Sequence, residues 1–124
     1  MLGPFEGLWR ASFLDNTGMK MRLEEIINNR PIKRGLALYS VDLNTGETII
    51  FDESMPPAFL PSAIAASASI PALFMPTYFD EKTMVDGLVL SNLDLSEAIT
   101  KCQDQGYADE DIIVDVILCF DKNV

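Results

Sequence analysis

An aspartate-glycine pair, Asp86-Gly87, is the first place in the chain where residue types and spacing suggest chemistry. The pair stands between apolar runs that are typical of strand, so the carboxylate falls where burial is expected. Burying a charge without a partner is costly, which points to a functional carboxylate. The same dipeptide between apolar runs is also the usual two-residue hairpin turn. The pattern therefore leaves two interpretations open, a functional carboxylate and a turn.

Three short stretches near this pair share a pattern with one known family. They are Ala-Ser-Ala-Ser-Ile-Pro-Ala-Leu-Phe-Met-Pro at 66–76, Met-Val-Asp-Gly at 84–87 and Ser-Asn-Leu at 91–93. Together they resemble the second half of patatin-like phospholipase domains. Leu88 stands where that family has a second glycine, and Asp94 stands where a proline is expected. The resemblance implies that Asp86 is the aspartate of a Ser-Asp catalytic dyad.

A fourth stretch, residues 36–47, resembles the family's strand that ends in an Asp-Leu-x-Thr-Gly turn. It offers Asp42 as a second candidate for a buried carboxylate. The alternative is that the Asp42 side chain bonds the amides of its own turn, which turn chemistry favours. The resemblance extends over roughly residues 13–120 and contains no internal repeat or linker.

The sequence offers no candidate for the nucleophilic serine that such a dyad needs. The sequence contains no Gly-x-Ser-x-Gly and no glycine-rich oxyanion loop, and Phe5 occupies the serine position of the one similar glycine frame. Ser67 and Ser69 lack flanking glycines and a neighbouring base, so we expect structural roles for both. The chain has no histidine, which excludes a Ser-His-Asp triad or a histidine-ligated zinc site within it.

Composition narrows the classes of partner. The 124 residues predict one domain, residues 1–124, with a net charge of −10 and a pI of about 4.2. Such a charge argues against nucleic acid and against electrostatic docking on anionic lipid. Cys102 and Cys119 form no disulfide framework and have no metal-type spacing, so reduced thiols are expected. No metal and no cofactor is expected.

One uncharged segment, Met55–Phe79, is long enough to cross a bilayer. It contains five prolines, which would leave unpaired backbone groups in lipid, so we interpret it as a buried helix and loop. Residues 1–13 lack the basic start and continuous apolar core of a secretory signal. We therefore expect a cytoplasmic chain that acts on a lipid or acyl ester, with peripheral membrane contact left open.

The remaining pattern predicts an α/β fold. The resemblance implies a partial patatin-like three-layer sandwich, with a central sheet and flanking helices. The first expected elements are a helix that opens at 13–18, with Asn16 or Thr17 as N-cap, and ends at Pro31, and a hairpin of strands 35–43 and 47–51. A helix from 57 or 60 to 69 follows, and then an aromatic loop. The last two are a helix with an Asp94–Glu97 capping box, which runs to Gln105 with Gly106 at C′, and a buried strand over 112–120. Methionines and aromatics between 55 and 84 line either an acyl-chain groove or a plain core.

The functional hypothesis is that the chain is the C-terminal portion of a lipid acyl hydrolase domain that begins after the nucleophile elbow. It would hydrolyse phospholipid or acylglycerol esters only together with the serine, and would be inactive alone. One rival is a non-catalytic remnant that binds lipid or protein around residues 74–79. Another is an unrelated α/β interaction domain in which Asp86-Gly87 is only a turn. An uncovered edge of the strand at 112–120 predicts self-association.

Overall fold

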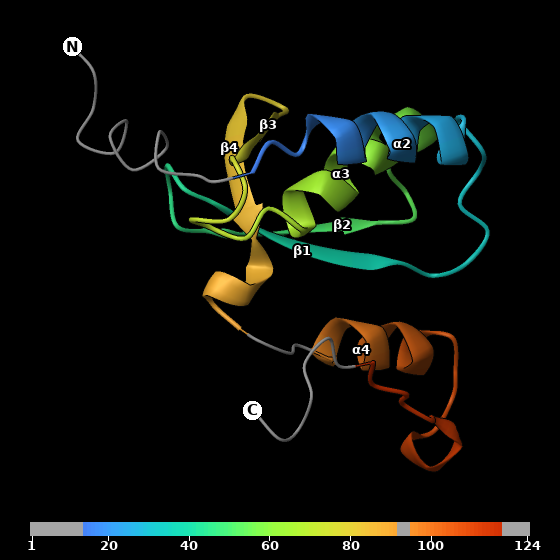
Figure 1. The fold of residues 1–124 in the computed structure, drawn as a ribbon. Coiled ribbons are helices and arrows are strands. Elements are labelled where there is room, and N and C mark those ends of the chain that lie inside the picture. The colour runs from blue at the N-terminus through green and yellow to red at the C-terminus, as the bar shows by residue number, and fades with distance from the viewer. Residues whose placement is uncertain (1–13, 92–94, 118–124) are drawn as a thin grey trace. The chain divides into compact units, whose positions relative to one another are not determined.

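The computed structural model describes residues 14–91 and 95–117 of the chain. Its contacts divide the chain into two compact units, Met1–Asp94 and Leu95–Val124, and each is described by itself. The first unit contains α2 (Thr17–Ile27), β1 (Ala37–Asp42), β2 (Thr48–Asp52), the 3-10 turn η1 (Pro57–Phe59), α3 (Leu60–Ser67), β3 (Thr77–Phe79), β4 (Lys82–Asp86) and the 3-10 turn η2 (Gly87–Val89) (Figure 1). The second contains α4 (Ser96–Asp104) and the 3-10 turn η3 (Asp109–Asp111).

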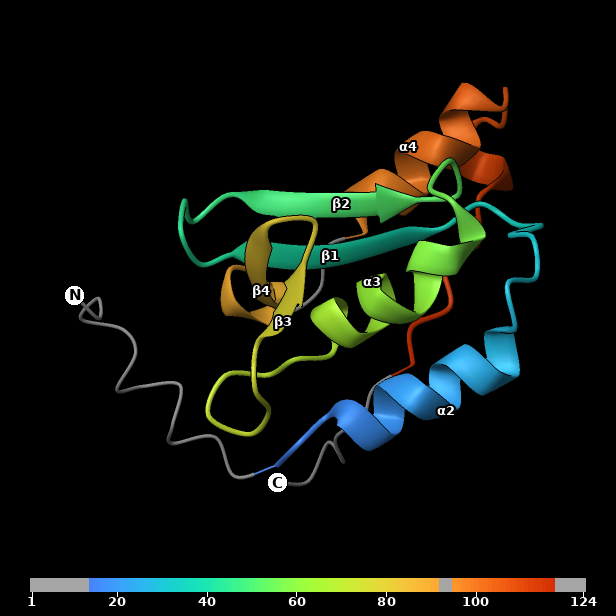
Figure 2. The same ribbon diagram turned by 90° about the horizontal axis from the view of Figure 1, so that it is seen from above.

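The four strands form one antiparallel sheet in the order β2-β1-β4-β3 (Figure 2). The central strands β1 and β4 come from different hairpins and pair Ser40 with Asp86 and Val41 with Val85. Side chains that lie directly opposite each other in such a pair project from the same face of the sheet. The predicted α/β fold class is confirmed, and the sheet brings Asp86 beside β1.

Two tight turns set the register of this sheet. The predicted turn at 44–46 joins β1 to β2, with Gly46 at φ 75° donating its N–H to the carbonyl oxygen of Asp42 at 2.7 Å. A second turn joins β3 to β4 through Asp80 and Glu81, at φ 51° and 61°. Left-handed backbone at both central residues defines a type I′ hairpin turn. The aromatic loop expected here is therefore partly a strand.

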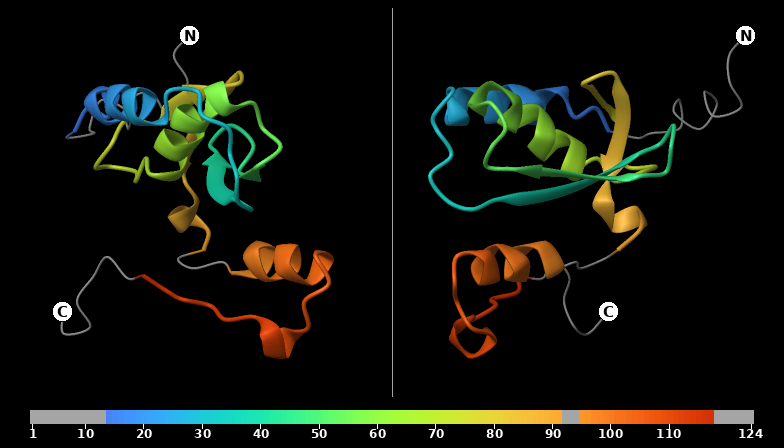
Figure 3. Two further views of the ribbon diagram at one scale, coloured as in Figure 1. Left: turned by 90° about the vertical axis from the view of Figure 1, so that its right-hand side faces the viewer. Right: turned by 180° about the vertical axis from the view of Figure 1, so that it is seen from behind.

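Helix α3 lies on the sheet against β1, β3 and β4, and α2 packs against α3 on the same side (Figure 3). The contact face of α3 is made of alanines, with Ala63, Ala65 and Ala66 all essentially inaccessible to solvent. Small side chains let the helix backbone approach the strands, where Met84 and Val85 complete the core. The position of the sheet beneath α3 thus follows from the small residues predicted for this helix.

Helix α2 begins as predicted, with Asn16 as N-cap, but it ends earlier than predicted. Asn16 holds the N-cap position, but its side chain makes no capping bond; instead Asp15 accepts hydrogen bonds from the Thr17 N–H at 2.9 Å and the Thr17 hydroxyl at 2.6 Å. The helix ends at Ile27 rather than Pro31, because Asn28 adopts the left-handed conformation (φ 42°) that terminates a helix.

The uncharged segment Met55–Phe79 folds as η1, α3, a turn and β3. Within residues 14–91 and 95–117, no helix is both long and apolar enough to span a bilayer.

In the second unit, α4 ends in the predicted way. Gly106 has φ 93°, its N–H donates to the carbonyl of Gln103, and the Tyr107 N–H donates to the carbonyl of Cys102, which is the Schellman arrangement. The capping box is not formed as predicted, because α4 begins at Ser96 with Leu95 as N-cap. Asp94, its predicted cap, lies outside the described residues.

The strand predicted at 112–120 is wrong over residues 112–117, which form no strand and pair with no other segment of the described chain. Residues 118–120 lie outside the described part. Ile113 is 88% exposed and Ile117 is 92% exposed. An apolar run becomes a strand only when a neighbouring strand satisfies its backbone groups, and periodicity alone does not supply that neighbour.

Candidate active site

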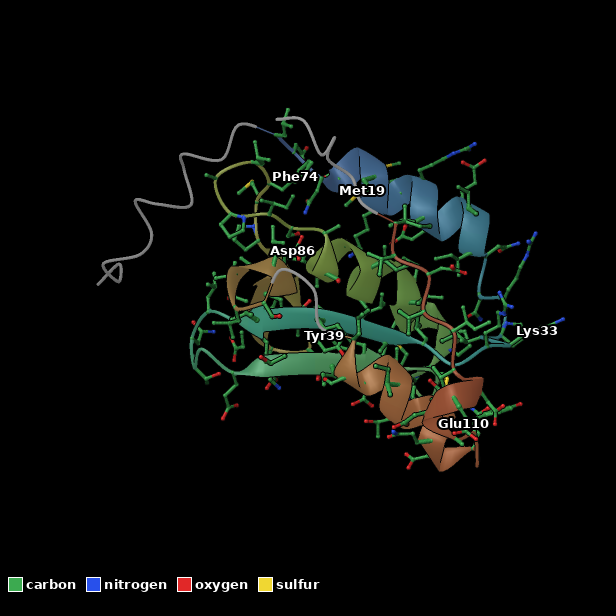
Figure 4. All side chains as sticks on the ribbon, turned by 90° about the horizontal axis from the view of Figure 1, so that it is seen from below. Met19, Lys33, Tyr39, Phe74, Asp86 and Glu110 are labelled. Carbon is green, nitrogen blue, oxygen red and sulfur yellow. The ribbon has the colours of Figure 1, made fainter. Side chains whose placement is uncertain are left out.

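Asp86 is the last residue of β4, and Gly87 begins the 3-10 turn η2. The interpretation of Asp86-Gly87 as a hairpin turn is wrong, because the reversal between β3 and β4 occurs six residues earlier, at Asp80. The half-buried Asp86 lies at the end of the sheet away from the loop that carries Lys33 (Figure 4). Strand β4 therefore presents this carboxylate at a sheet end that solvent reaches.

One oxygen of the Asp86 carboxylate is fixed and the other is available. Oδ1 accepts a hydrogen bond of 2.9 Å from the N–H of Leu88, which makes Asp86 the side-chain cap of η2. Among the described residues, Oδ2 accepts no hydrogen bond. A carboxylate held at one oxygen keeps its orientation while the other oxygen can receive a proton from a hydroxyl. This arrangement suits a general base.

Position 87 requires glycine because its backbone lies very close to β1. A β-carbon built on Gly87 would lie 2.7 Å from Cβ of Tyr39 and 3.0 Å from the Tyr39 carbonyl oxygen. Only glycine lets β4 leave the sheet and turn into η2 this close to the neighbouring backbone.

The main chain of Asp86 is anchored to the end of α3. Its N–H donates to the carbonyl oxygen of Ser69 at 2.9 Å. Ser69 is fully buried, and its hydroxyl donates to the carbonyl of Ala65 at 2.6 Å and lies 2.9 Å from the Thr77 hydroxyl. The structural role predicted for Ser69 agrees with these bonds, since a buried hydroxyl engaged in this way is not presented to a substrate.

A family model described as patatin-like phospholipase matches residues 3–99. The chain belongs to the patatin-like phospholipase family. The match spans the whole described part of the first unit, including Asp86-Gly87, and ends within α4. Membership in the patatin-like phospholipases relates the chain to lipid acyl hydrolases and implies a lipid substrate. Residues 112–120 lie outside the match.

Asp42, the second candidate carboxylate of this patatin-like chain, bonds groups of its own turn. It is buried; its Oδ1 accepts from the Asn44 N–H at 3.0 Å and its Oδ2 from the Thr45 hydroxyl at 3.2 Å. Both oxygens therefore serve the β1–β2 turn, which confirms the turn interpretation. Asp86 is left as the candidate carboxylate of the site.

Two residues that the sequence analysis did not connect with the site lie next to Asp86 or its anchor. Ser40 stands opposite Asp86 in the β1–β4 pairing, is fully buried, and has no hydrogen-bond partner for its hydroxyl in the described chain. Asn16 was expected only as a helix cap, but its amide reaches Ser69. No local sequence signal marks either one, because both contacts join segments far apart in the chain.

Within residues 14–91 and 95–117, no group of three or more cysteine, aspartate and glutamate side chains is arranged to hold a metal ion. Cys102 is a free thiol, and Cys119 lies outside the described residues. The pKa of Asp15 is lowered by its hydrogen bonds from the Thr17 hydroxyl and N–H, but Asp15 is fully exposed at the start of α2.

Proposed function

We propose that Asp86 is the general base of a Ser-Asp dyad that hydrolyses lipid esters. The observation that carries the proposal is the Asp86 carboxylate itself, fixed at Oδ1 by the Leu88 N–H and unpartnered at Oδ2 among the described residues. The family membership supports it, because the lipid acyl hydrolases to which the chain is related cleave carboxylic esters.

The proposed reaction has two half-steps. In the first, a serine oxygen attacks the ester carbonyl while its proton passes to Oδ2 of Asp86, and the proton then leaves with the alcohol as the acyl-serine forms. In the second, water attacks the acyl-serine, gives its proton to Asp86, and releases the fatty acid; the proton returns to the serine oxygen. Asp86 ends each turnover ionised, so it acts as a catalyst.

The serine must come from outside these 124 residues, since the sequence contains no Gly-x-Ser-x-Gly. We therefore propose that the chain supplies the base half of the dyad and has no esterase activity by itself. An oxyanion hole is also needed, and its donors would accompany the serine.

A second candidate function is a lipid-binding module without catalysis. The observation that favours it is the apolar side chains of Leu88, Val89 and Leu90, which directly follow Asp86-Gly87 and are 39%, 51% and 59% exposed. An apolar surface beside the carboxylate suits an acyl chain whether or not a serine completes the site.

The experiment joins this sequence to a segment with a family-type Gly-x-Ser-x-Gly elbow and measures hydrolysis of a phospholipid ester. Asp86→Asn should lower kcat/KM by about 10²–10⁴-fold, because the amide cannot accept the serine proton. Asp80→Asn is the matched control, since it makes the same change of charge in the β3–β4 turn, where asparagine is favoured. Hydrolysis at the parent rate by Asp86→Asn would contradict the proposal and favour the binding module.

A further inference from the structure

The main-chain N–H of Asp86 is bonded to a buried residue outside the sheet. The Asp86 N–H donates to the Ser69 carbonyl at 2.9 Å, so the position of Ser69 sets where β4 ends against α3. Ser69 begins the turn that leads to β3, and its side chain is completely buried. What fixes Ser69 therefore also fixes the main chain of the candidate base.

The Ser69 hydroxyl uses its full bonding capacity. A serine hydroxyl has one proton to donate and two lone pairs to accept with. Its proton goes to the Ala65 carbonyl at 2.6 Å. The Thr77 hydroxyl, 2.9 Å away, must then be the donor in the bond between the two hydroxyls. The second lone pair accepts from Nδ2 of Asn16 at 3.1 Å.

Asn16 is the member of this network that comes from a distant segment. Its Nδ2 also donates to the carbonyl oxygen of Met75 at 3.1 Å and lies 3.5 Å from the Thr77 hydroxyl oxygen. Because a carbonyl can only accept, the contact with Met75 fixes which end of the amide faces the network. One NH₂ group thereby ties together the two ends of the turn between α3 and β3.

The turn that Asn16 closes needs such support. Within it, Ala72 has φ 70°, a left-handed conformation that is costly for a residue with a β-carbon. The neighbouring bond from the Leu14 N–H to the Leu73 carbonyl, 2.9 Å long, fixes the middle of the same turn. The segment just before α2 thus holds the turn at its ends and at its centre.

We infer that Asn16 is a positioning residue for Asp86, which it holds in place through Ser69. This inference rests on the proposed function of Asp86. Proton transfer requires the carboxylate oxygen to lie within hydrogen-bond reach of the serine, and a shift of about 1 Å is enough to cost roughly 10²-fold in rate. Asn16 is linked to Asp86 only through Ser69 in the described network, so the proposed effect is on the position of the carboxylate.

The first test follows amide hydrogen exchange in the full chain by NMR. Asn16→Ala should speed exchange of the Asp86 amide by about fivefold, the scale of one lost hydrogen bond. The reference is the Leu43 amide, which donates to the Thr83 carbonyl in the same sheet and has no link to Asn16. Asp15→Ala is the matched control, since it weakens the start of α2 without touching Ser69.

Ser69→Ala removes the Asn16–Ser69 bond together with the hydroxyl's bonds to Ala65 and Thr77, and it gives the same readout if Asn16→Ala does not fold. In the double variant the combined effect should be smaller than the sum of the two single effects, because both variants lose the Asn16–Ser69 contact. An unchanged ratio of Asp86 to Leu43 exchange, or an equal rise in both amides, would overturn the inference.

The second test uses the serine-containing protein. Asn16→Ala should lower kcat by about tenfold or more while KM stays within about twofold, and Asp15→Ala should leave both unchanged. The two proposals fail in different ways. Full activity in Asp86→Asn would remove the catalytic role, whereas the exchange ratio would still decide whether Asn16 positions Asp86.

Discussion

Gly87 and Tyr39 lie so close together that no side chain fits between them: a β-carbon on Gly87 would stand 2.7 Å from Cβ of Tyr39. Real β-carbons do not approach other atoms at that distance, and the Tyr39 carbonyl oxygen is only 3.0 Å away. The contact joins β1 to the point where the chain leaves β4, immediately after Asp86. The glycine of the Asp-Gly pair is therefore explained by packing.

Gly87→Ala is predicted to destabilise the domain by about 1–3 kcal/mol, because β4 or β1 must shift to admit the methyl group. Urea unfolding followed by circular dichroism measures the change. Gly18→Ala is the control, since a β-carbon there meets nothing within 4 Å. A Gly87→Ala variant as stable as the parent would mean that the two strands are farther apart than the structure shows.

Ser40→Ala is predicted to raise stability by about 1 kcal/mol. The Ser40 hydroxyl is fully buried and has no hydrogen-bond partner in the described chain, so no bond offsets the free energy of its desolvation. Replacing the hydroxyl with hydrogen removes that desolvation cost. Ser69→Ala is the matched comparison: it is equally buried but fully hydrogen-bonded, and its loss should cost about 1–3 kcal/mol. Destabilisation by Ser40→Ala similar to that of Ser69→Ala would show that Ser40 has a partner.

The sequence predicts the local elements of this fold well and their long-range partners poorly. The β1–β2 turn, the alanine-rich α3 and the glycine that ends α4 were all predicted, because each depends on residues that are close in the chain. The β3–β4 hairpin was missed, since Asp80-Glu81 is not one of the usual pairs for a type I′ turn. The strand at 112–117 was wrong because an apolar run does not reveal whether a neighbour exists to pair with it.

In the candidate site, too, the sequence indicates what is local and not what depends on long-range contacts. Asp86 was proposed from the motif around it, because such a motif is local in sequence. Asn16 and Ser40 were not, because one reaches Ser69 across 53 residues and the other meets Asp86 only through strand pairing. Residues that hold a site in place through tertiary contacts leave no periodic or spaced signal of their own.

Asp15 is predicted to make part of the stability depend on pH. Hydrogen bonds from Thr17, chiefly from its hydroxyl, lower the pKa of Asp15 below its ordinary value of 3.8 in the folded chain. A lowered folded pKa means that the contribution is present above the unfolded pKa and is lost as pH falls through the folded pKa. The loss therefore belongs to the range below about pH 3.8.

Urea midpoints of the parent and Asp15→Asn, measured from neutral pH into this acid range, test that dependence. The parent should be the more stable at neutral pH, and the difference should shrink as pH falls below 3.8. Thr17→Val, which removes the hydroxyl donor, should show a smaller pH dependence than the parent. A difference between parent and Asp15→Asn that stays constant with pH would argue against the capping role.

The exposed apolar residues at 113–117 predict that the chain self-associates through this segment. Ile113 and Ile117 are 88% and 92% exposed, and Asp115 is the one charge in a run of strong strand formers. Such a run gains backbone hydrogen bonds and buried area by pairing with the same segment of a second copy. The net charge of −10 opposes association but does not cover these side chains.

Sedimentation velocity over a range of concentrations tests this prediction. The parent should form dimers or larger species, and Ile113→Lys combined with Ile117→Lys should be monomeric. The control combines Met21→Lys with Ile26→Lys on α2; it makes the same change in charge at two other exposed apolar residues, so it should associate like the parent. A parent that stays a single monomeric species at every concentration, or a control that dissociates as fully as the test variant, would show that residues 113–117 do not drive association.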